Sequence, residues 1–272
     1  MVLALEAFAQ RHPGHEGRVG LLLTSDEEGP ALDGVRRVAD AFARSAERVT
    51  WCVVGEPSSK TDLGDVVRVG RRGSLSARVL VRGVQGHVAF PEIALNPIHV
   101  VAPALAELAG TRWDRGTAQF PPTTFQISNI HAGTGATNVI PGELELDCNF
   151  RFCPASSAES LMQRLEAVLA RHELDYRVEW TLSGAPYYTP PGRLLRALSA
   201  AVKERLGIEP QPNTGGGTSD GRFIAALGAE VVEFGPVNAS IHKLNENVRV
   251  ADLEHLVAVY LRTAERLLVD RS

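Results

Sequence analysis

The sequence predicts an α/β fold: a doubly wound, mostly parallel sheet with an inserted α+β domain. In the first part, two apolar runs at 18–24 and 51–57 enclose an amphipathic stretch at 31–47. Strand, helix and strand in that order imply a parallel crossover, which is the repeating unit of a doubly wound sheet. After residue 65 the pattern changes to alternating, valine-rich strands, which indicate an antiparallel sheet. We therefore expect the chain to divide into three segments, of which the outer two form one domain: 1–71, 72–183 and 184–272.

The first segment opens on the end of a helix over residues 1–12, with Val2, Leu5 and Phe8 on one stripe. A strand at 18–24 follows, and it ends in Thr-Ser and three carboxylates. The stretch 31–47 repeats apolar residues at helical spacing, which predicts a surface helix packed on a sheet; these residues are Leu32, Val35, Val38, Ala39 and Phe42. The strand at 51–57 again ends in a carboxylate, that of Glu56.

The middle segment reads as strands and helices of an α+β layer. Arg71–Gly73 is expected to be a turn between its first strands, and Ser156 with Glu159 forms a capping box that opens a helix. The expected strands are 66–69, 76–84, 123–130, 143–152 and 176–182, and the other helix spans 91–108.

The last segment returns to the first domain. A helix begins near Leu194 and ends at Gly207, a residue type that favours the position after a helix C-terminus. A glycine-rich loop at 213–220 and a buried strand at 231–235 follow. Asp252 is expected to cap a final amphipathic helix.

Composition narrows the function classes. The chain has 272 residues, a net charge of −4 and ordinary charged content, so no basic face predicts nucleic-acid binding. No apolar run is long enough to cross a membrane, and the N-terminus does not resemble a signal peptide. Three cysteines without CxxC spacing favour a reducing, cytoplasmic compartment and disfavour a disulfide framework or a cysteine zinc site.

Acidic residues follow both apolar runs of the first segment. In an open α/β sheet the carboxyl ends of the strands carry the chemistry, so Glu27, Glu28 and Glu56 are expected at one edge. With His242, which lies in a loop after the strand 231–235, they make a donor set that suits Zn²⁺, Co²⁺ or Mn²⁺. The alternatives are a solvated acidic turn at a helix N-terminus and a histidine that only forms structural hydrogen bonds.

Three further features carry potential chemistry. His87 stands between a strand and a proline-broken turn, where it either reaches a site or closes its own turn. The run Asn213–Arg222 lets backbone approach a ligand closely, but it lacks the pattern of a nucleotide-binding loop; otherwise it is a flexible loop. Arg151 suits carboxylate recognition, although structural ion pairing is the commoner use of arginine.

Taken together, these segments resemble the M20 family of metal-dependent amidohydrolases and peptidases over nearly the whole chain. The resemblance rests on seven motifs in order: Leu23–Glu28, Val54–Pro57, Arg71–Leu75, Gly86–Pro91, Asn138–Gly142, Gly216–Arg222 and Phe234–Lys243.

The resemblance implies a role for each matched residue. Glu27 matches the general base, and Glu28, Glu56 and His242 match ligands of a two-metal site that holds zinc or cobalt. His87 is similar to the histidine that reaches the partner subunit's site and helps to hold the tetrahedral oxyanion. The family contacts substrate carboxylates and the amide at the positions of Arg151, Asn138, Gly217, Thr218 and Asn238. The outer segments resemble the family's catalytic domain and the middle one its lid and dimerisation domain, which implies a homodimer.

Two upstream ligands of the family are absent from this sequence: a histidine in a His-x-Asp motif and a bridging aspartate. His12 and His15 do not stand in such a motif. We therefore expect a family member without its first hundred or so residues, a large part of a domain, and with reduced metal occupancy and activity.

The implied reaction is hydrolysis of the amide of N-succinyl-LL-2,6-diaminopimelate, a small-molecule substrate of lysine and diaminopimelate biosynthesis. Two alternatives remain open. One is another amidohydrolase of the family, such as an acetylornithine deacetylase or an aminoacylase. The other is a non-catalytic dimeric remnant.

Overall fold

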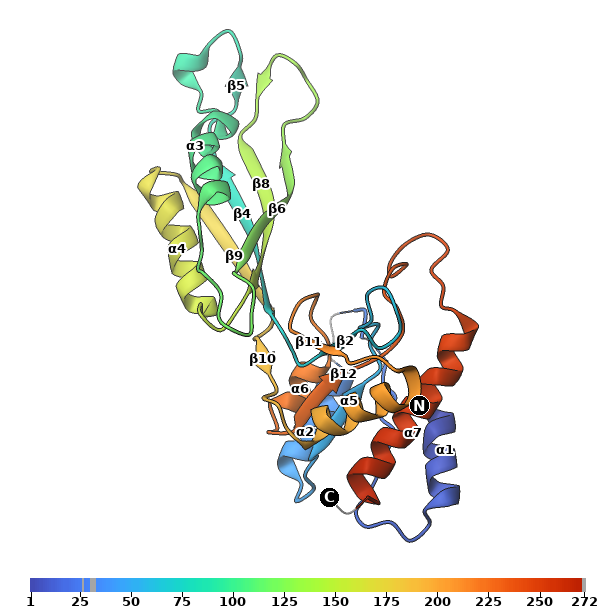
Figure 1. The fold of residues 1–272 in the computed structure, drawn as a ribbon. Coiled ribbons are helices and arrows are strands. Elements are labelled where there is room, and N and C mark those ends of the chain that lie inside the picture. The colour runs from blue at the N-terminus through green and yellow to red at the C-terminus, as the bar shows by residue number, and fades with distance from the viewer. Residues whose placement is uncertain (26, 30–32, 271–272) are drawn as a thin grey trace. The chain divides into compact units, whose positions relative to one another are not determined.

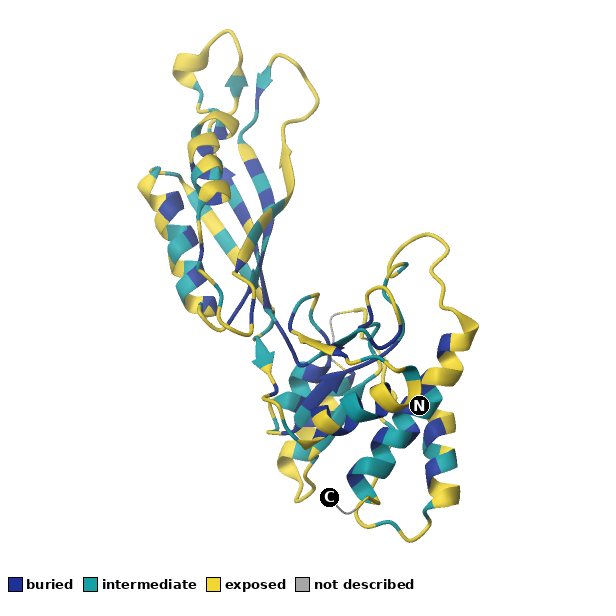
Figure 2. Cartoon of the chain, in the orientation of Figure 1, coloured by how far each residue is buried: buried dark blue, intermediate teal, exposed yellow. Residues whose placement is uncertain are grey.

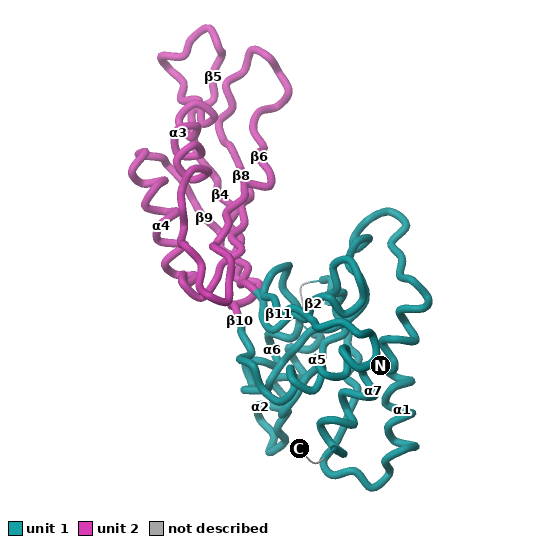
Figure 3. Tube along the Cα trace, in the orientation of Figure 1, with its two compact units in different colours: residues 1–71, 187–272 teal, residues 72–186 magenta. Residues whose placement is uncertain are grey.

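The computed structural model describes residues 1–25, 27–29 and 33–270. The chain divides into two compact units, one made of residues 1–71 and 187–272 and the other of residues 72–186 (Figure 3). Each unit has its own hydrophobic core. In the described part of the chain, no helix is long and apolar enough to cross a membrane.

The first unit is built on a mixed four-stranded sheet in the order β1-β12-β2-β11. Strand β1 (Trp51–Val54) runs parallel to β12 (Glu230–Glu233), and β2 (Val66–Arg68) runs parallel to β11 (Gln211–Asn213). The two pairs meet antiparallel, through Glu233 and Arg68. Because β1 and β12 are parallel, the loops that follow them, which hold Glu56 and His242, leave the sheet at the same edge.

Helices cover both faces of this sheet (Figure 1). Helices α5 (Arg193–Leu206) and α7 (Val250–Leu268) pack with β2 and β12 in one core. On the other side, α2 (Val35–Arg44) and α6 (Gly221–Ala225) enclose a smaller core with β1 and β12. Helix α1 (Val2–Arg11) packs on α7 through Ala4 and Phe8.

The second unit is an antiparallel sheet covered on one face by two helices. Its strands follow the order β6-β8-β4-β9, with β4 (Gly73–Arg82) and β8 (Glu143–Phe152) in the centre. The edges are β6 (Thr124–Ala132) and β9 (Tyr176–Gly184). Helices α3 (Pro97–Gly110) and α4 (Ala158–Arg171) share one core with the buried face of the sheet, and burial along the strands alternates as the pleat requires (Figure 2).

The remaining elements are short. Strand β3 (Gly70–Arg71) pairs with β10 (Tyr187–Tyr188) in the first unit, and β5 (Gly86–His87) pairs with β7 (Val139–Ile140) in the second. A 3₁₀ turn, η1 (Pro91–Ile93), follows β5.

The α/β class with an α+β unit is as the sequence predicts, but the expected strand at 18–24 is wrong. These residues form no ladder, and Val19, Leu22 and Leu23 are exposed. An apolar run becomes a buried strand only when it pairs with a neighbouring strand, and among the described strands β1 pairs with β12 alone. The expected parallel crossover between 18–24 and β1 is therefore not formed.

Several helix ends also differ from the expectation. Helix α2 spans Val35–Arg44 within the expected 31–47, and Leu32 lies outside the described residues. The cap of α4 is Ser157, whose hydroxyl accepts from the Ser160 amide, one residue beyond the expected Ser156. Helix α7 begins earlier, so Asp252 lies in its first turn and pairs with Arg249.

Two smaller expectations also fail. Arg71–Gly73 is extended backbone between β3 and β4 and does not form a turn. The expected stripe of helix α1 fails at Val2, which is exposed, and holds at Phe8, which is buried together with Ala4. The expected end of α5 holds: Gly207 adopts the left-handed conformation, with φ of 71°.

Candidate functional site

Three glutamates of the first unit, Glu27, Glu28 and Glu56, gather near the carboxyl ends of β1 and β12. Glu56 follows β1 by two residues and is partly buried. Burial raises its pKa to about 7, with further contributions from the negative charges of Glu27 and Glu233. The pKa of Glu27 is raised as well, first by burial and then by Asp220 and Glu28. The three glutamates 27, 28 and 56 thus lie close enough to repel one another.

His242 joins this cluster through Glu28. Its Nε2 atom lies 3.4 Å from Oε1 of Glu28, and both side chains are largely exposed. The backbone of His242 is left-handed, with φ of 57°, an uncommon conformation for a residue other than glycine. Among the residues that the structure describes, no three His, Cys, Asp or Glu side chains are grouped as metal ligands. The geometry therefore brings one oxygen of Glu28 and one nitrogen of His242 together as two potential metal-binding atoms.

A fully buried carboxylate, that of Glu233, lies near the cluster, and its charge contributes to the raised pKa of Glu27 and of Glu56. Glu233, the last residue of β12, accepts hydrogen bonds from Arg71 Nε at 2.8 Å and from Tyr187 Oη at 2.5 Å. The Arg71 Nη2 and Ser219 Oγ atoms also donate to it. Burial opposes the charge of Arg71, but the Glu233 carboxylate raises the pKa of the guanidinium above its ordinary value.

Glu233 connects three distant segments of the chain. Arg71 is the last residue before the chain enters the second unit, and Tyr187 is the first residue after it returns. Ser219 lies near the end of the glycine-rich loop. Sequence reasoning gave Glu233 no role, although a carboxylate that ends the apolar run 231–232 was a visible signal of a paired buried charge.

The glycine-rich loop rests on the arginine of this network. Nη1 of Arg71 lies 3.4 Å from the Gly215 carbonyl oxygen, and a side chain at Gly216 would overlap that guanidinium. The Asn213 side chain accepts from the Gly215 amide at 2.6 Å. Gly217 is exposed, and Thr218 is partly buried. The loop therefore needs glycine at 216, where φ is also positive, and it exposes the backbone of Gly217 beside it.

The segment after β12 carries the remaining candidate of this unit. Asn238 donates its backbone N–H to the Ser59 carbonyl oxygen at 2.9 Å, and the neighbouring Val237 bridges to Ser59. Gly235 approaches the backbone of Glu56 so closely that a Cβ atom would overlap the Glu56 carbonyl oxygen. The segments that follow β1 and β12, which carry Glu56 and Asn238, are thus held against each other.

Three predicted site residues belong to the second unit. His87 and Asn138 lie near each other, because β5 pairs with β7 and the Asn138 carbonyl accepts from the Val88 amide at 3.1 Å. His87 is exposed, and its Nδ1 accepts from the Ala89 amide at 3.1 Å, which leaves Nε2 for other partners. Arg151 lies on β8, on the sheet face opposite the two helices.

Comparison with known proteins identifies the family. The Peptidase dimerisation domain family matches residues 69–177. A protein of Stenotrophomonas maltophilia K279a named succinyl-diaminopimelate desuccinylase is 59% identical over 98% of this chain, which spans 72% of that relative. A protein of the same name from Nitrosomonas europaea is 57% identical over 98% of this chain and 71% of its own length.

Solved structures show the same fold. A putative aminohydrolase from methicillin-resistant Staphylococcus aureus matches with a TM-score of 0.75 at 17% identity, over 98% of this chain and 70% of its own. A Bacillus subtilis protein described as a dinuclear metal binding peptidase of the M20 family matches with a TM-score of 0.67 at 16% identity, over 98% and 69%. The chain therefore belongs to the M20 family of hydrolases, among the relatives of succinyl-diaminopimelate desuccinylase.

Proposed function

We propose that the protein hydrolyses the amide of N-succinyl-LL-2,6-diaminopimelate to succinate and LL-2,6-diaminopimelate. The observation that carries the proposal is identity of 57–59% over 98% of the chain to proteins named for this reaction. The cluster of Glu27, Glu28, Glu56 and His242 at one edge of the first sheet supplies the chemistry that such a reaction needs.

The acidic cluster fits a divalent metal. Carboxylates that raise one another's pKa repel each other when ionised, and a bound cation relieves this repulsion. The imidazole of His242, 3.4 Å from Glu28, adds a nitrogen ligand to the oxygen ligands. We assign Glu28, Glu56 and His242 as ligands of zinc or cobalt. When bound, such a metal polarises the amide carbonyl and lowers the pKa of a water molecule.

Glu27 is the proposed general base. Its raised pKa brings the carboxyl closer to the pH at which it can both accept and return a proton. It would take a proton from the attacking water and deliver it to the nitrogen of the departing amine. The proton balance then closes, because the same group is restored at the end of the cycle.

The remaining candidates orient the substrate. In the first unit, the open backbone at Gly217, with Thr218 and Asn238, offers hydrogen bonds to the amide and carboxylate groups. In the second, Arg151 and Asn138 offer a guanidinium and a carboxamide. We propose that the protein works as a homodimer in which His87 stabilises the oxyanion in the partner's site.

The substitution Glu27→Gln tests the assignment of the base. It should slow release of free amine from the succinylated substrate by about 10²–10⁴-fold, because proton transfer in the transition state is lost. The affinity for Zn²⁺, measured by isothermal titration calorimetry, should equal that of the unaltered chain. A variant with full activity would remove Glu27 from the mechanism, and a variant that binds Zn²⁺ more weakly would make Glu27 a ligand. Profiling of N-acetyl amino acids in parallel checks the substrate.

A further inference from the structure

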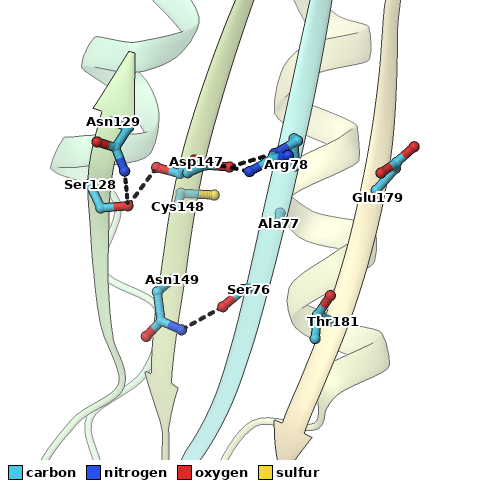
Figure 4. A pocket seen from close by; sticks show the side chains of 10 residues that line it. All are labelled: Ser76, Ala77, Arg78, Ser128, Asn129, Asp147, Cys148, Asn149, Glu179 and Thr181. Atoms are coloured by element: carbon cyan, nitrogen blue, oxygen red, sulfur yellow. Dashed lines mark hydrogen bonds and ion pairs between the residues drawn. The ribbon is translucent and has the colours of Figure 1, made fainter. Parts of the chain in front are cut away.

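The open face of the sheet in the second unit is lined mainly by polar side chains. Along β8, the side chains on this face are Glu145, Asp147, Asn149 and Arg151 in succession. Figure 4 shows the middle of this face, where a pocket is bounded by Asn149, Ser76 and the Arg78–Asp147 pair. Asn149 donates to Ser74 at 3.1 Å and to Ser76 at 2.9 Å, which fixes its amide.

Most arginines on this face are neutralised by a carboxylate. Arg78 contacts Asp147 at 2.9 Å and Glu145 at 3.6 Å. Arg82 pairs with Asp175 at 3.3 Å, and Arg177 pairs with Glu179 at 2.9 Å. These pairs lie on the exposed surface, where each carboxylate neutralises its guanidinium but adds little to the free energy of unfolding.

Arg151 and Arg72 differ from these three. Within residues 1–25, 27–29 and 33–270, neither forms an ion pair with a carboxylate. Arg72 Nη1 donates to Thr124 Oγ1 at 3.2 Å and lies 3.5 Å from the Pro122 carbonyl oxygen. Its Nε atom is buried without a partner in the described structure.

The two guanidinium groups share one end of the face. Thr124, which accepts from Arg72, stands directly opposite Arg151 in the β6–β8 register, and Ser74 stands opposite Arg151 on β4. Directly opposed side chains on neighbouring strands lie about 5 Å apart at Cβ. The pKa of Arg72 is lowered by burial and then by the charge of Arg151, as expected for neighbouring cations.

We propose that Arg72 and Arg151 together form a carboxylate-binding site, in which Arg72 is a second binding residue beside Arg151. Two partly buried cations without a counter-ion carry an electrostatic cost that a bound anion relieves. Guanidinium groups bind carboxylates bidentately, and in the described structure Arg72 contacts only neutral acceptors, the Thr124 hydroxyl and the Pro122 carbonyl. The hydroxyl of Thr124 and the peptide carbonyl of Pro122 orient the side chain.

The proposed ligand is the free carboxylate at the end of the succinyl group, an assignment that rests on the proposed function. A succinyl amide differs from an acetyl amide by this carboxylate, so a site with two arginines would distinguish the two acyl groups. The same chemistry could bind a carboxylate of diaminopimelate, and the experiment separates these sources.

The test measures binding of succinate and of LL-2,6-diaminopimelate to the full chain by isothermal titration calorimetry. Arg72→Met should weaken succinate binding by about tenfold or more, because a charge-assisted bidentate contact is lost. The succinate affinity of Arg72→Lys should lie between those of the unaltered chain and Arg72→Met, because lysine keeps the positive charge but cannot form the bidentate contact. Arg78→Met is the matched control, on the same face and already paired with Asp147 and Glu145; it should leave the affinity unchanged.

A chemical readout avoids any dependence on variant folding. Succinate should slow modification of Arg72 and Arg151 in the unaltered protein by phenylglyoxal, read by mass spectrometry, and should leave Arg78 unaffected. Absence of succinate binding or of protection at Arg72 would overturn the proposal, as would protection by diaminopimelate alone. Arg72-dependent succinate binding without any hydrolysis would uphold the site and count against the proposed function instead.

Discussion

Single carboxylates in the first unit sit in environments that change their protonation. Glu56 has an ordinary pKa of 4.5, and in the folded chain burial, then Glu27 and Glu233, raise it to about 7, while Arg71 opposes the shift. A carboxyl whose pKa is raised by folding stabilises the protein below its ordinary pKa, and that contribution disappears as pH rises through the folded value.

The melting temperature in the presence of a chelator should therefore fall between about pH 4.5 and 7, in part because of Glu56. The pKa of Glu27 is raised as well, so the contribution of Glu56 is read from the difference in melting temperature between the unaltered chain and Glu56→Gln. Glu56→Gln should show a flatter decline over that interval in differential scanning calorimetry. A variant that keeps the full pH dependence would show that the raised pKa belongs to another group.

The Arg71–Glu233 pair leads to a second prediction for a single residue. Glu233→Gln would leave a buried guanidinium without a counter-ion, which costs about 3–5 kcal/mol of the free energy of unfolding. Urea denaturation should show the loss as a lower midpoint. Glu204→Gln is the control: Glu204 also pairs with arginines, Arg262 and Arg266, but at the surface, so its loss should cost about 1 kcal/mol or less. Equal effects of the two substitutions would contradict the argument.

Among the elements, the junction of β1 and β12 depends on one glycine. A Cβ atom at Gly235 would overlap the Glu56 carbonyl oxygen and approach that of Gly55, both of which are backbone atoms that cannot rotate away. Gly235→Ala should therefore separate the two strand ends and lower stability by about 1–3 kcal/mol. Gly110→Ala, where a Cβ meets nothing within 4 Å, is the matched control and should be neutral or stabilising. An unchanged melting temperature for Gly235→Ala would show that the junction adapts.

The elements also show what a sequence pattern can predict. The alternation in 143–152 predicts β8 correctly. Every second side chain of this strand packs in the core that α3 and α4 share, so the period of the sequence equals the period of burial. The run at 18–24 failed because burial of a strand depends on partners distant in sequence. The place of Glu56 could be anticipated from the end of β1, whereas Glu27 and Glu28 follow a run that forms no strand. The Glu233 network could not be anticipated, since Arg71, Tyr187 and Ser219 meet only after the sheet register is set.

For the whole molecule, association is expected through the second unit. Its sequence matches the Peptidase dimerisation domain family, and its sheet has two open edges, β6 and β9, with exposed Ile130 and Leu182. Open edges tend to pair or to be covered. Light scattering at micromolar concentration should give twice the chain mass of 29.3 kDa. Ile130→Lys should dissociate the dimer if β6 forms the interface, and Leu182→Lys should do so if β9 forms it. A monomeric unaltered protein would refute the prediction.

The number of metal ligands that the described residues bring together leads to the last prediction. Catalytic zinc sites normally keep three protein ligands. Here Glu28 and His242 form one donor pair, and the described residues contain no group of three suitable side chains. Two ligands compete poorly with water, so isothermal titration with Zn²⁺ should show weak binding that His242→Ala abolishes. His131→Ala, at an exposed histidine on β6, should leave the titration unchanged. Two tight sites per chain, or binding that survives His242→Ala, would mean that other residues hold the metal and that Glu28, Glu56 and His242 are wrongly assigned.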